Sequence, residues 1–355
     1  MANPTHAIDT GEHEWGVESP ITTLFDFDYT EGREQLLRLY DKGTRRQWIG
    51  SDRIDWSPEI DFDNPLGVPD DIIPIAGTKW WDAMNDAEKG EVRRHMASWQ
   101  FSQFMHGEQG ALICASKIVQ SVPDIDSKFY GATQVIDEAR HVEVYSRYLH
   151  DKVQLVYPLN GNLRSLLDDV ISDSRWDVTY LGMQVLIEGL ALAAFALIRN
   201  SAGDPIAKSV NAYVMQDEAR HVMFGRLALR DFYPQLTQKE RDEREELCVD
   251  ACYRMRDRFL GEEVWENLGL PSEVTEYVET SELQRTFRGF LFMRIVPILK
   301  DIGLWGEKIQ SAFTDMGVLG WADTDIDDAM AEDEEAAEEL DRARMAHIQA
   351  VAADA

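Results

Sequence analysis

The sequence predicts an all-α protein built on a four-helix bundle, with additional helices and an irregular N-terminal arm. The first observation behind this prediction is a duplicated pattern. A lone Glu in an apolar stretch is followed, at the same interval in both copies, by Asp-Glu-Ala-Arg-His-Val, starting once at Asp137 and once at Asp217. The second observation is that turn residues lie near the middle of each interval, which divides each copy into two helices of similar length.

Residues 1–80 are expected to form the irregular arm, because Pro and Asp turns recur there. One helix is expected within it, over about 31–42, with Gly43 as its stop signal. The helical domain is expected to cover residues 81–305, starting at an N-cap near Asn85.

The first copy of the pattern places Glu108 on an ascending helix and Glu138 on the returning helix, with Pro123 at the turn. At about 1.5 Å per helical residue, each run is about 21 Å long, so the two carboxylates lie at the same height. Glu138 and His141 are three residues apart and share one helix face.

The second copy repeats this arrangement with Glu188, Glu218 and His221. Four carboxylates and two imidazoles around one cavity are the ligand set of a two-metal site in a four-helix bundle. This mixed oxygen and nitrogen set suits iron or manganese better than the thiolate-rich sets of structural zinc sites do. The competing interpretation is surface salt bridging on amphipathic helices. The matched register and the apolar surroundings of both lone Glu residues argue against it, because an unpaired buried carboxylate is costly.

The residues beside these candidate ligands have expected roles of their own. Asp137 and Asp217 are placed to orient the ligand imidazoles, each across the bundle to the opposite His, because a metal-bound His needs an acceptor for its other ring nitrogen. Arg140 and Arg220 are expected to pair with these Asp residues.

The later segments are expected to decorate the bundle. Thr237 opens a capping box and a fifth helix that runs to about Leu260. A sixth helix is expected from about Ser281, with a kink at Pro297. Residues 306–355 are expected to be an acidic C-terminal tail, either a solvated helix or a disordered end.

Two DExRH motifs, each with an upstream Glu in an apolar helix, resemble the ferritin-like di-iron carboxylate superfamily. Within it, the Asp and Arg residues resemble those of bacterial multicomponent monooxygenase hydroxylases and ribonucleotide reductase small subunits. The resemblance implies a ferritin-like bundle that holds two iron ions, with manganese or a mixed pair as alternatives, and activates O2 to oxidise a small organic substrate. It also implies one metal on Glu108, Glu138 and His141, the other on Glu188, Glu218 and His221, and bridging or shifting roles for Glu138 and Glu218.

One position differs from the hydroxylases, and another matches the ribonucleotide reductase small subunits. Leu192 stands where many of the hydroxylases have a Thr, which puts a proton relay there in doubt. Tyr145 stands where the small subunits have a radical Tyr, so it is the candidate redox-active residue, whereas the equivalent position in the second copy is Gly225. We favour the alternative that Tyr145 only hydrogen-bonds a ligand carboxylate.

Residues on the ligand faces are expected to line the substrate cavity. They are Phe104, Ala111, Leu112, Gln184, Ala191, Leu192 and Phe195. A mostly apolar lining with one amide favours an apolar or aromatic small molecule. The alternative is that these side chains simply fill the core.

Composition restricts the partners. A net charge of −30 over 355 residues argues against nucleic acid and anionic membrane surfaces. The three cysteines are expected to be reduced thiols in the cytoplasm, and no secretory signal is evident. No dinucleotide, P-loop or iron–sulfur motif is evident, so electrons would come from a separate reductase or from the substrate. A homodimer is compatible with the sequence.

Two other functions stay open at this point. A radical-generating subunit of the ribonucleotide reductase type would use Tyr145 and need a large partner. An iron-oxidising or storage protein would use the same ligands, but the long arm and extra helices make it less attractive.

Overall fold

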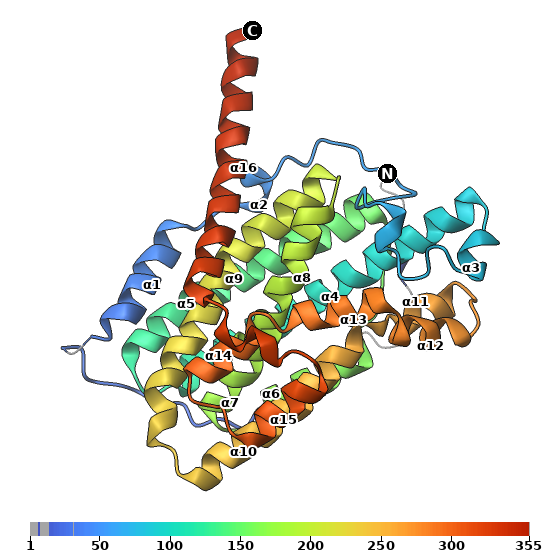
Figure 1. The fold of residues 1–355 in the computed structure, drawn as a ribbon. Coiled ribbons are helices and arrows are strands. Elements are labelled where there is room, and N and C mark those ends of the chain that lie inside the picture. Colours follow the sequence, from blue (N-terminus) through green and yellow to red (C-terminus); the bar gives the residue numbers. More distant parts are fainter. Residues whose placement is uncertain (1–5, 8–13, 31, 355) are drawn as a thin grey trace.

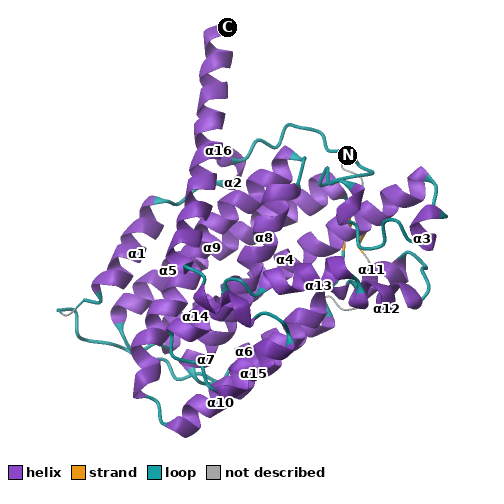
Figure 2. Ribbon diagram, in the orientation of Figure 1, coloured by secondary structure: helices purple, strands orange, loops and turns teal. Residues whose placement is uncertain are grey.

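Four long helices form the centre of the computed structural model, which describes residues 6–7, 14–30 and 32–354 (Figure 1). They are α4 Asp86–Ser121, α5 Ile125–Arg147, α8 Glu188–Ser201 and α9 Pro205–Phe232. Short turns join α4 to α5 and α8 to α9, so each pair is antiparallel and packs along its length. The predicted all-α class is confirmed, because nearly every regular element is a helix (Figure 2).

Side-chain caps fix where three of these helices begin. Asn85 caps α4 in a reciprocal capping box with Glu88, as its sequence position predicts. Asp124 caps α5, and Asp204 caps α9 with Pro205 in the first turn. These caps set the heights at which α4, α5 and α9 start, whereas α8 has no side-chain cap.

Helix α8 continues a longer helical stretch through α7 Trp176–Tyr180 and the π-helix η3 Leu181–Ile187. The stretch Trp176–Ser201 is long and apolar enough to cross a membrane, but 83% of its most apolar window is buried inside the protein. Its apolarity is therefore explained by its central position. The π-helix ends immediately before Glu188, and π-turns of this kind occur often at functional sites.

The N-terminal arm contains short helices that cover the bundle. They are α1 Glu34–Arg45, α2 Gly50–Arg53, η1 Asp70–Ile72 and α3 Lys79–Asp82. The prediction that Gly43 ends the first helix is wrong, because α1 continues to Arg45. Gly43 instead allows α1 to approach α5, since a Cβ there would lie 3.3 Å from Thr133 Oγ1. Residue 31, the expected start of this helix, lies outside the described residues.

The remaining elements surround the bundle. In the sequence between α5 and α7, the chain forms η2 Tyr148–Val153, β2 Leu155–Val156 and α6 Gly161–Ser172. After α9 come η4 Tyr233–Gln235, α10 Gln238–Asp257, η5 Arg258–Leu260, α11 Glu262–Asn267, α12 Glu273–Thr280, α13 Glu282–Leu291, α14 Ile295–Asp301, α15 Glu307–Asp315 and η6 Leu319–Asp323. The only strands in the described part of the chain are β1 His6–Ala7 and β2, which pair in parallel.

Two predictions about these later elements can be scored. The capping box at Thr237 is confirmed as the start of α10. The expected helix with a kink at Pro297 is wrong in detail, because the chain forms two separate helices, α13 and α14. The break between them comes before Pro297, which lies in the first turn of α14.

The acidic C-terminal segment forms one long helix, α16 Ile326–Asp354, whose first half packs on α9 and whose end projects away from the bundle (Figure 1). Asp333 is 1% exposed and forms ion pairs with Arg199 at 3.1 Å and with Arg294 at 2.7 Å. Asp341 receives Arg53 of α2 at 2.6 Å. Residues 306–355, expected as a tail, therefore begin with packed elements held partly by buried ion pairs.

Candidate metal centre

The four central helices bring together the six side chains that the duplicated pattern singled out. This donor cluster consists of Glu108 on α4, Glu138 and His141 on α5, Glu188 on α8, and Glu218 and His221 on α9. All six are buried, and the most accessible, Glu108, is 5% exposed. The cluster therefore lies inside the bundle, with little contact with solvent.

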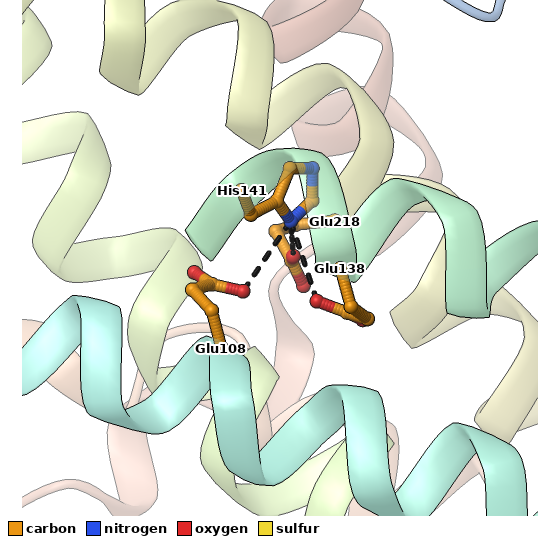
Figure 3. A group of neighbouring side chains, drawn as sticks. All are labelled: Glu108, Glu138, His141 and Glu218. Carbon is orange, nitrogen blue, oxygen red and sulfur yellow. Dashed lines mark hydrogen bonds and ion pairs between the residues drawn. The ribbon is translucent and has the colours of Figure 1, made fainter. Parts of the chain in front are cut away.

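Three carboxylates of the donor cluster converge on Nδ1 of His141 (Figure 3). Glu218 Oε1 lies 3.0 Å from this nitrogen, and Glu108 Oε2 and Glu138 Oε2 each lie 3.3 Å from it. Donor atoms of these four residues all lie within 4.8 Å of one another, so the group can hold a metal ion.

A second group of four forms around His221. Its Nδ1 lies 3.0 Å from Glu138 Oε1 and 3.4 Å from Glu218 Oε1, and Glu188 completes the group within the same 4.8 Å limit. Glu138 and Glu218 belong to both groups. Two neighbouring ions could therefore share these two carboxylates.

The donor cluster contains buried polar atoms that have no partner within the protein and that a bound cation would satisfy. Five of its buried atoms have no hydrogen-bond partner among the described residues: Glu138 Oε2, Glu188 Oε2, both carboxylate oxygens of Glu218, and His221 Nδ1. Buried polar atoms are normally satisfied, and unsatisfied carboxylate oxygens are especially costly. Hard oxygen donors and imidazole nitrogens aimed at one space match the preferences of iron and manganese.

The pKa values of the donor cluster reflect this excess of negative charge. Burial raises the pKa of Glu108 and Glu188 well above the usual range, and neighbouring carboxylates add to the effect. Burial also acts to raise the pKa of Glu138, but His221 and His141 hold it below its ordinary value. Nearby carboxylates raise the pKa of both imidazoles against the opposing effect of burial. Without cations, protons balance the charge, so metal binding would displace them.

The Asp residues of the two motifs orient the imidazoles across the bundle. His141 Nε2–H donates to Asp217 Oδ2 at 3.2 Å, and His221 Nε2–H donates to Asp137 Oδ2 at 3.2 Å. This pairing leaves each Nδ1 directed toward the cluster, where a metal ion would take the place of its proton. Arg140 donates to Asp217 at 2.9 Å and also to Asp137.

A family model described as p-aminobenzoate N-oxygenase AurF matches residues 30–303, which include the whole donor cluster. The chain belongs to this family. The family consists of di-iron oxygenases with a ferritin-like fold, so the predicted superfamily, enzyme class and two-iron cofactor are confirmed at that level. No curated protein matches the chain significantly.

Three residues around the cluster are not evident from the duplicated pattern. Gln134 Nε2 donates to Glu138 Oε1 and to Glu188 Oε1, both at 2.9 Å. Trp48 Nε1 donates to Asp217 at 2.8 Å, and Gln47 Nε2 donates to Asp137 at 2.8 Å. Gln134 lies one helical turn before Glu138, which is a usable sequence signal. Gln47 and Trp48 come from the arm, where no local pattern marks them.

Tyr145 does not contact a ligand carboxylate by hydrogen bonding, so the interpretation favoured from the sequence is wrong. Its hydroxyl donates to Asn211 Oδ1 at 3.3 Å instead. The ring packs against Phe101, Phe104 and Phe195 in a buried aromatic group. Burial, followed by the charges of nearby cluster carboxylates, raises the pKa of Tyr145 well above its usual range. In this protein of the family, the phenol is therefore neutral and held by an amide.

None of the residues expected to line a substrate cavity lines the apolar cavity of about 310 Å³ in the described chain. Phe104 and Phe195 stack edge to face, with ring centroids 4.6 Å apart. Gln184 is fully buried, and its Nε2 lies 3.4 Å from Gln134 Oε1. Leu192 is fully buried, Ala111 is nearly so, and Leu112 and Ala191 are partly exposed.

Proposed function

We propose that the donor cluster holds two iron ions and that the chain oxygenates the nitrogen of a small aromatic amine. The convergence of six buried donors, five of whose atoms lack partners, carries the proposal. One ion would lie on Glu108, Glu138 and His141, and the other on Glu188, Glu218 and His221. When bound, the ions would supply the redox chemistry for O2 activation.

The protein residues would position the ligands and protect the reaction from water. Asp137 and Asp217 would accept the Nε2 protons and so hold each ring with Nδ1 directed at a bound ion. Burial acts to raise the pKa of Asp217, but Arg220, His141 and Arg140 hold it well below its ordinary value. The packed rings of the neighbouring aromatic group would exclude bulk water from the reacting atoms.

The choice of an amine nitrogen rests on the family description and on the balance of the reaction. One oxygen atom of O2 forms an N–O bond in place of an N–H hydrogen, giving a hydroxylamine. The other oxygen leaves as water and takes up two electrons and two protons. Because the sequence contains no motif for an organic redox cofactor, we propose that a separate reductase or small reductant supplies these electrons.

The test is anaerobic loading with ferrous iron followed by exposure to ¹⁸O2, reductant and a panel of anilines. We expect two irons per chain and one ¹⁸O atom on the nitrogen of the product, measured by mass spectrometry. If the ¹⁸O label were found on a ring carbon, the reaction would be ring hydroxylation and the proposed N-oxygenation would be wrong. A loaded protein that oxidises iron without converting any organic compound would favour the iron-oxidising function instead.

We also propose a homodimer that forms through the outer faces of α4 and α5. Large apolar side chains are exposed there: Ile113 is 46%, Phe129 is 40% and Ile136 is 57% exposed. Because the chain carries a net charge of −30, an apolar face is where a second copy meets the least repulsion. Sedimentation of Ile136→Lys should give a monomer where the wild type gives a dimer, and a wild-type monomer would contradict the proposal.

A further inference from the structure

A cavity of about 310 Å³ lies outside the donor cluster, where the arm, the start of α4, the end of α8 and the later helices meet. Part of its lining comes from residues 64–74 of the arm, and another part comes from η5, α11 and α13. The lining is mainly large apolar side chains, among them Leu66, Trp99, Ile198, Phe259 and Trp265. Nothing in the duplicated metal pattern accounts for this space.

The cavity is aligned with the donor cluster along α4. Ala97 and Gln100 line the cavity, Phe104 follows one turn later, and Glu108 follows after another turn. Residues at these spacings share one helix face. Gln100 and Glu108 are therefore separated by about 12 Å along the helix axis.

Helix α8 repeats this alignment from the other direction. Glu188 is followed on the same face by Phe195, and Ile198, which lines the cavity, follows one turn after Phe195. Ile198 lies about 15 Å from Glu188 along the axis. Both helices therefore run from the cavity to the cluster, and the residues between the two along α4 and α8 define a path.

The edge-to-face pair of Phe104 and Phe195 stands midway along this path, with ring centroids 4.6 Å apart. Both rings are buried, and neither has a polar atom whose hydrogen bond would have to break when a ring turns. A rotation of either side chain would therefore change only van der Waals contacts.

The polar groups of the cavity are almost all used within the protein. Arg93 donates to Asp70 at 2.7 and 2.8 Å and lies over the Trp81 ring. Asn64 is bonded to the backbone of Val68. Gln100 and Thr286 are the exceptions, since neither side chain has a hydrogen-bond partner among the described residues. The space thus offers apolar walls, one amide and one hydroxyl, but no unpaired charge in its lining.

We propose that this cavity is an access chamber that binds an uncharged aromatic molecule before it passes the Phe104–Phe195 pair to the donor cluster. The proposal rests on the proposed function and adds to it a class of substrate, in which the ring carries no carboxylate. Arg258 is the cationic side chain that could bind a carboxylate beside the chamber residue Phe259. Its guanidinium is buried, and its Nη1 has no partner among the described residues, but Arg258 does not line the chamber.

Binding of two probes to the full-length protein tests the chamber. Calorimetry would compare ethyl p-aminobenzoate, which is uncharged, with p-aminobenzoate. We expect the ester to bind at least about tenfold more tightly, and Gln100→Trp to weaken ester binding by about tenfold or more. Gln238→Trp, at an exposed Gln at the start of α10, is the matched control and should bind the ester like the wild type.

The outcomes separate the chamber from the metal chemistry. Wild-type ester affinity in a folded Gln100→Trp variant would overturn the chamber. Tighter binding of p-aminobenzoate that is lost in Arg258→Met would overturn the restriction to uncharged molecules. Failure of the wild type to bind iron would refute the proposed function, whereas ester binding would still report on the chamber.

The aromatic pair has its own test. Phe104→Trp should slow turnover of the ester by about tenfold or more without weakening its binding in calorimetry, because the larger ring obstructs the path and not the chamber. Turnover at the wild-type rate in this variant would remove the pair from the path.

Discussion

The two helix pairs of the bundle carry the same motif but surround it differently. Each imidazole meets the Asp of the opposite pair at 3.2 Å, so the orienting contacts are symmetric. The upstream Glu residues are not equivalent, because Glu108 lies in the regular helix α4 whereas Glu188 directly follows the π-helix η3. The duplication has therefore preserved the donors and their orientation, while the local backbone has diverged.

Side chains one turn from the ligands show the same divergence. Gln134 donates to Glu138 and Glu188, and the equivalent position in the second pair is Val214, which has no such group. Tyr145 corresponds to Gly225. Two metals bound here would have similar ligands but unequal neighbours, so we expect the two sites to differ in affinity and reactivity.

The largest expected effect comes from removing the two carboxylates that belong to both groups. The double variant Glu138→Ala, Glu218→Ala should lose nearly all iron, because each ion then lacks two of its four candidate donors. Iron per chain after anaerobic loading and desalting is the measurement. Glu143→Ala, at an exposed Glu of α5, is the control and should keep two irons. Two irons retained in the double variant would exclude this ligand assignment.

The symmetry of the orienting contacts can be tested next. Asp137→Ala and Asp217→Ala should each fold but bind iron about 10- to 100-fold more weakly, because each leaves one imidazole without its acceptor. Competition with a chelator gives the affinities. Losses of similar size would support the symmetric arrangement, and wild-type affinity in both variants would reduce these Asp residues to structural ion pairs.

The unequal neighbourhoods predict a stability effect at Gly225. A Cβ there would lie 2.6 Å from Cβ of Gln184 in η3, so Gly225→Ala should lower the free energy of unfolding by about 1–3 kcal/mol. Gly107→Ala on α4 is the matched control, because its Cβ would meet nothing within 4 Å. It should raise stability by about 0.5–1 kcal/mol through helix propensity. Urea unfolding measures both, and equal effects would contradict the close approach of α9 to η3.

The smallest expected effect concerns the residue that corresponds to Gly225. Tyr145→Phe should keep both irons and cost about 1 kcal/mol of stability, because it loses one hydrogen bond to Asn211. Electron paramagnetic resonance after O2 exposure provides the second measurement. A stoichiometric, long-lived tyrosyl signal in the wild type that disappears in the variant would instead favour a radical-generating subunit.

The sequence was most informative where local signals coincide with geometry. The six donors are spaced so that helix rise and turn positions alone bring them to one height, and Asn85 and Thr237 start helices through purely local capping. The prediction that Gly43 ends the first helix is wrong because a glycine at a close helix crossing cannot be distinguished in the sequence from a glycine that ends a helix. Its role depends on α5, which the local sequence does not show.

Other features could not be predicted because they depend on tertiary packing. The π-helix η3 lies in a uniformly apolar stretch, where hydrophobic periodicity cannot separate one kind of turn from another. Gln47 and Trp48 reach the cluster only because α1 and the chain after it lie against α5 and α9. Tyr145 lies near the cluster carboxylates Glu108 and Glu218, as its spacing from His141 predicts, but its hydrogen-bond partner comes from a different helix.

The attachment of the arm has a consequence for protein engineering. All six donors lie between residues 108 and 221, so an excised four-helix fragment would contain the complete ligand set. It would lack Gln47 and Trp48. It would also lack Arg53, whose bond to Asp341 joins α16 to the arm. The smallest transferable unit of this centre is therefore larger than the bundle that supplies its ligands. A transplanted fragment would need substitutes for the arm side chains that bond to Asp137 and Asp217.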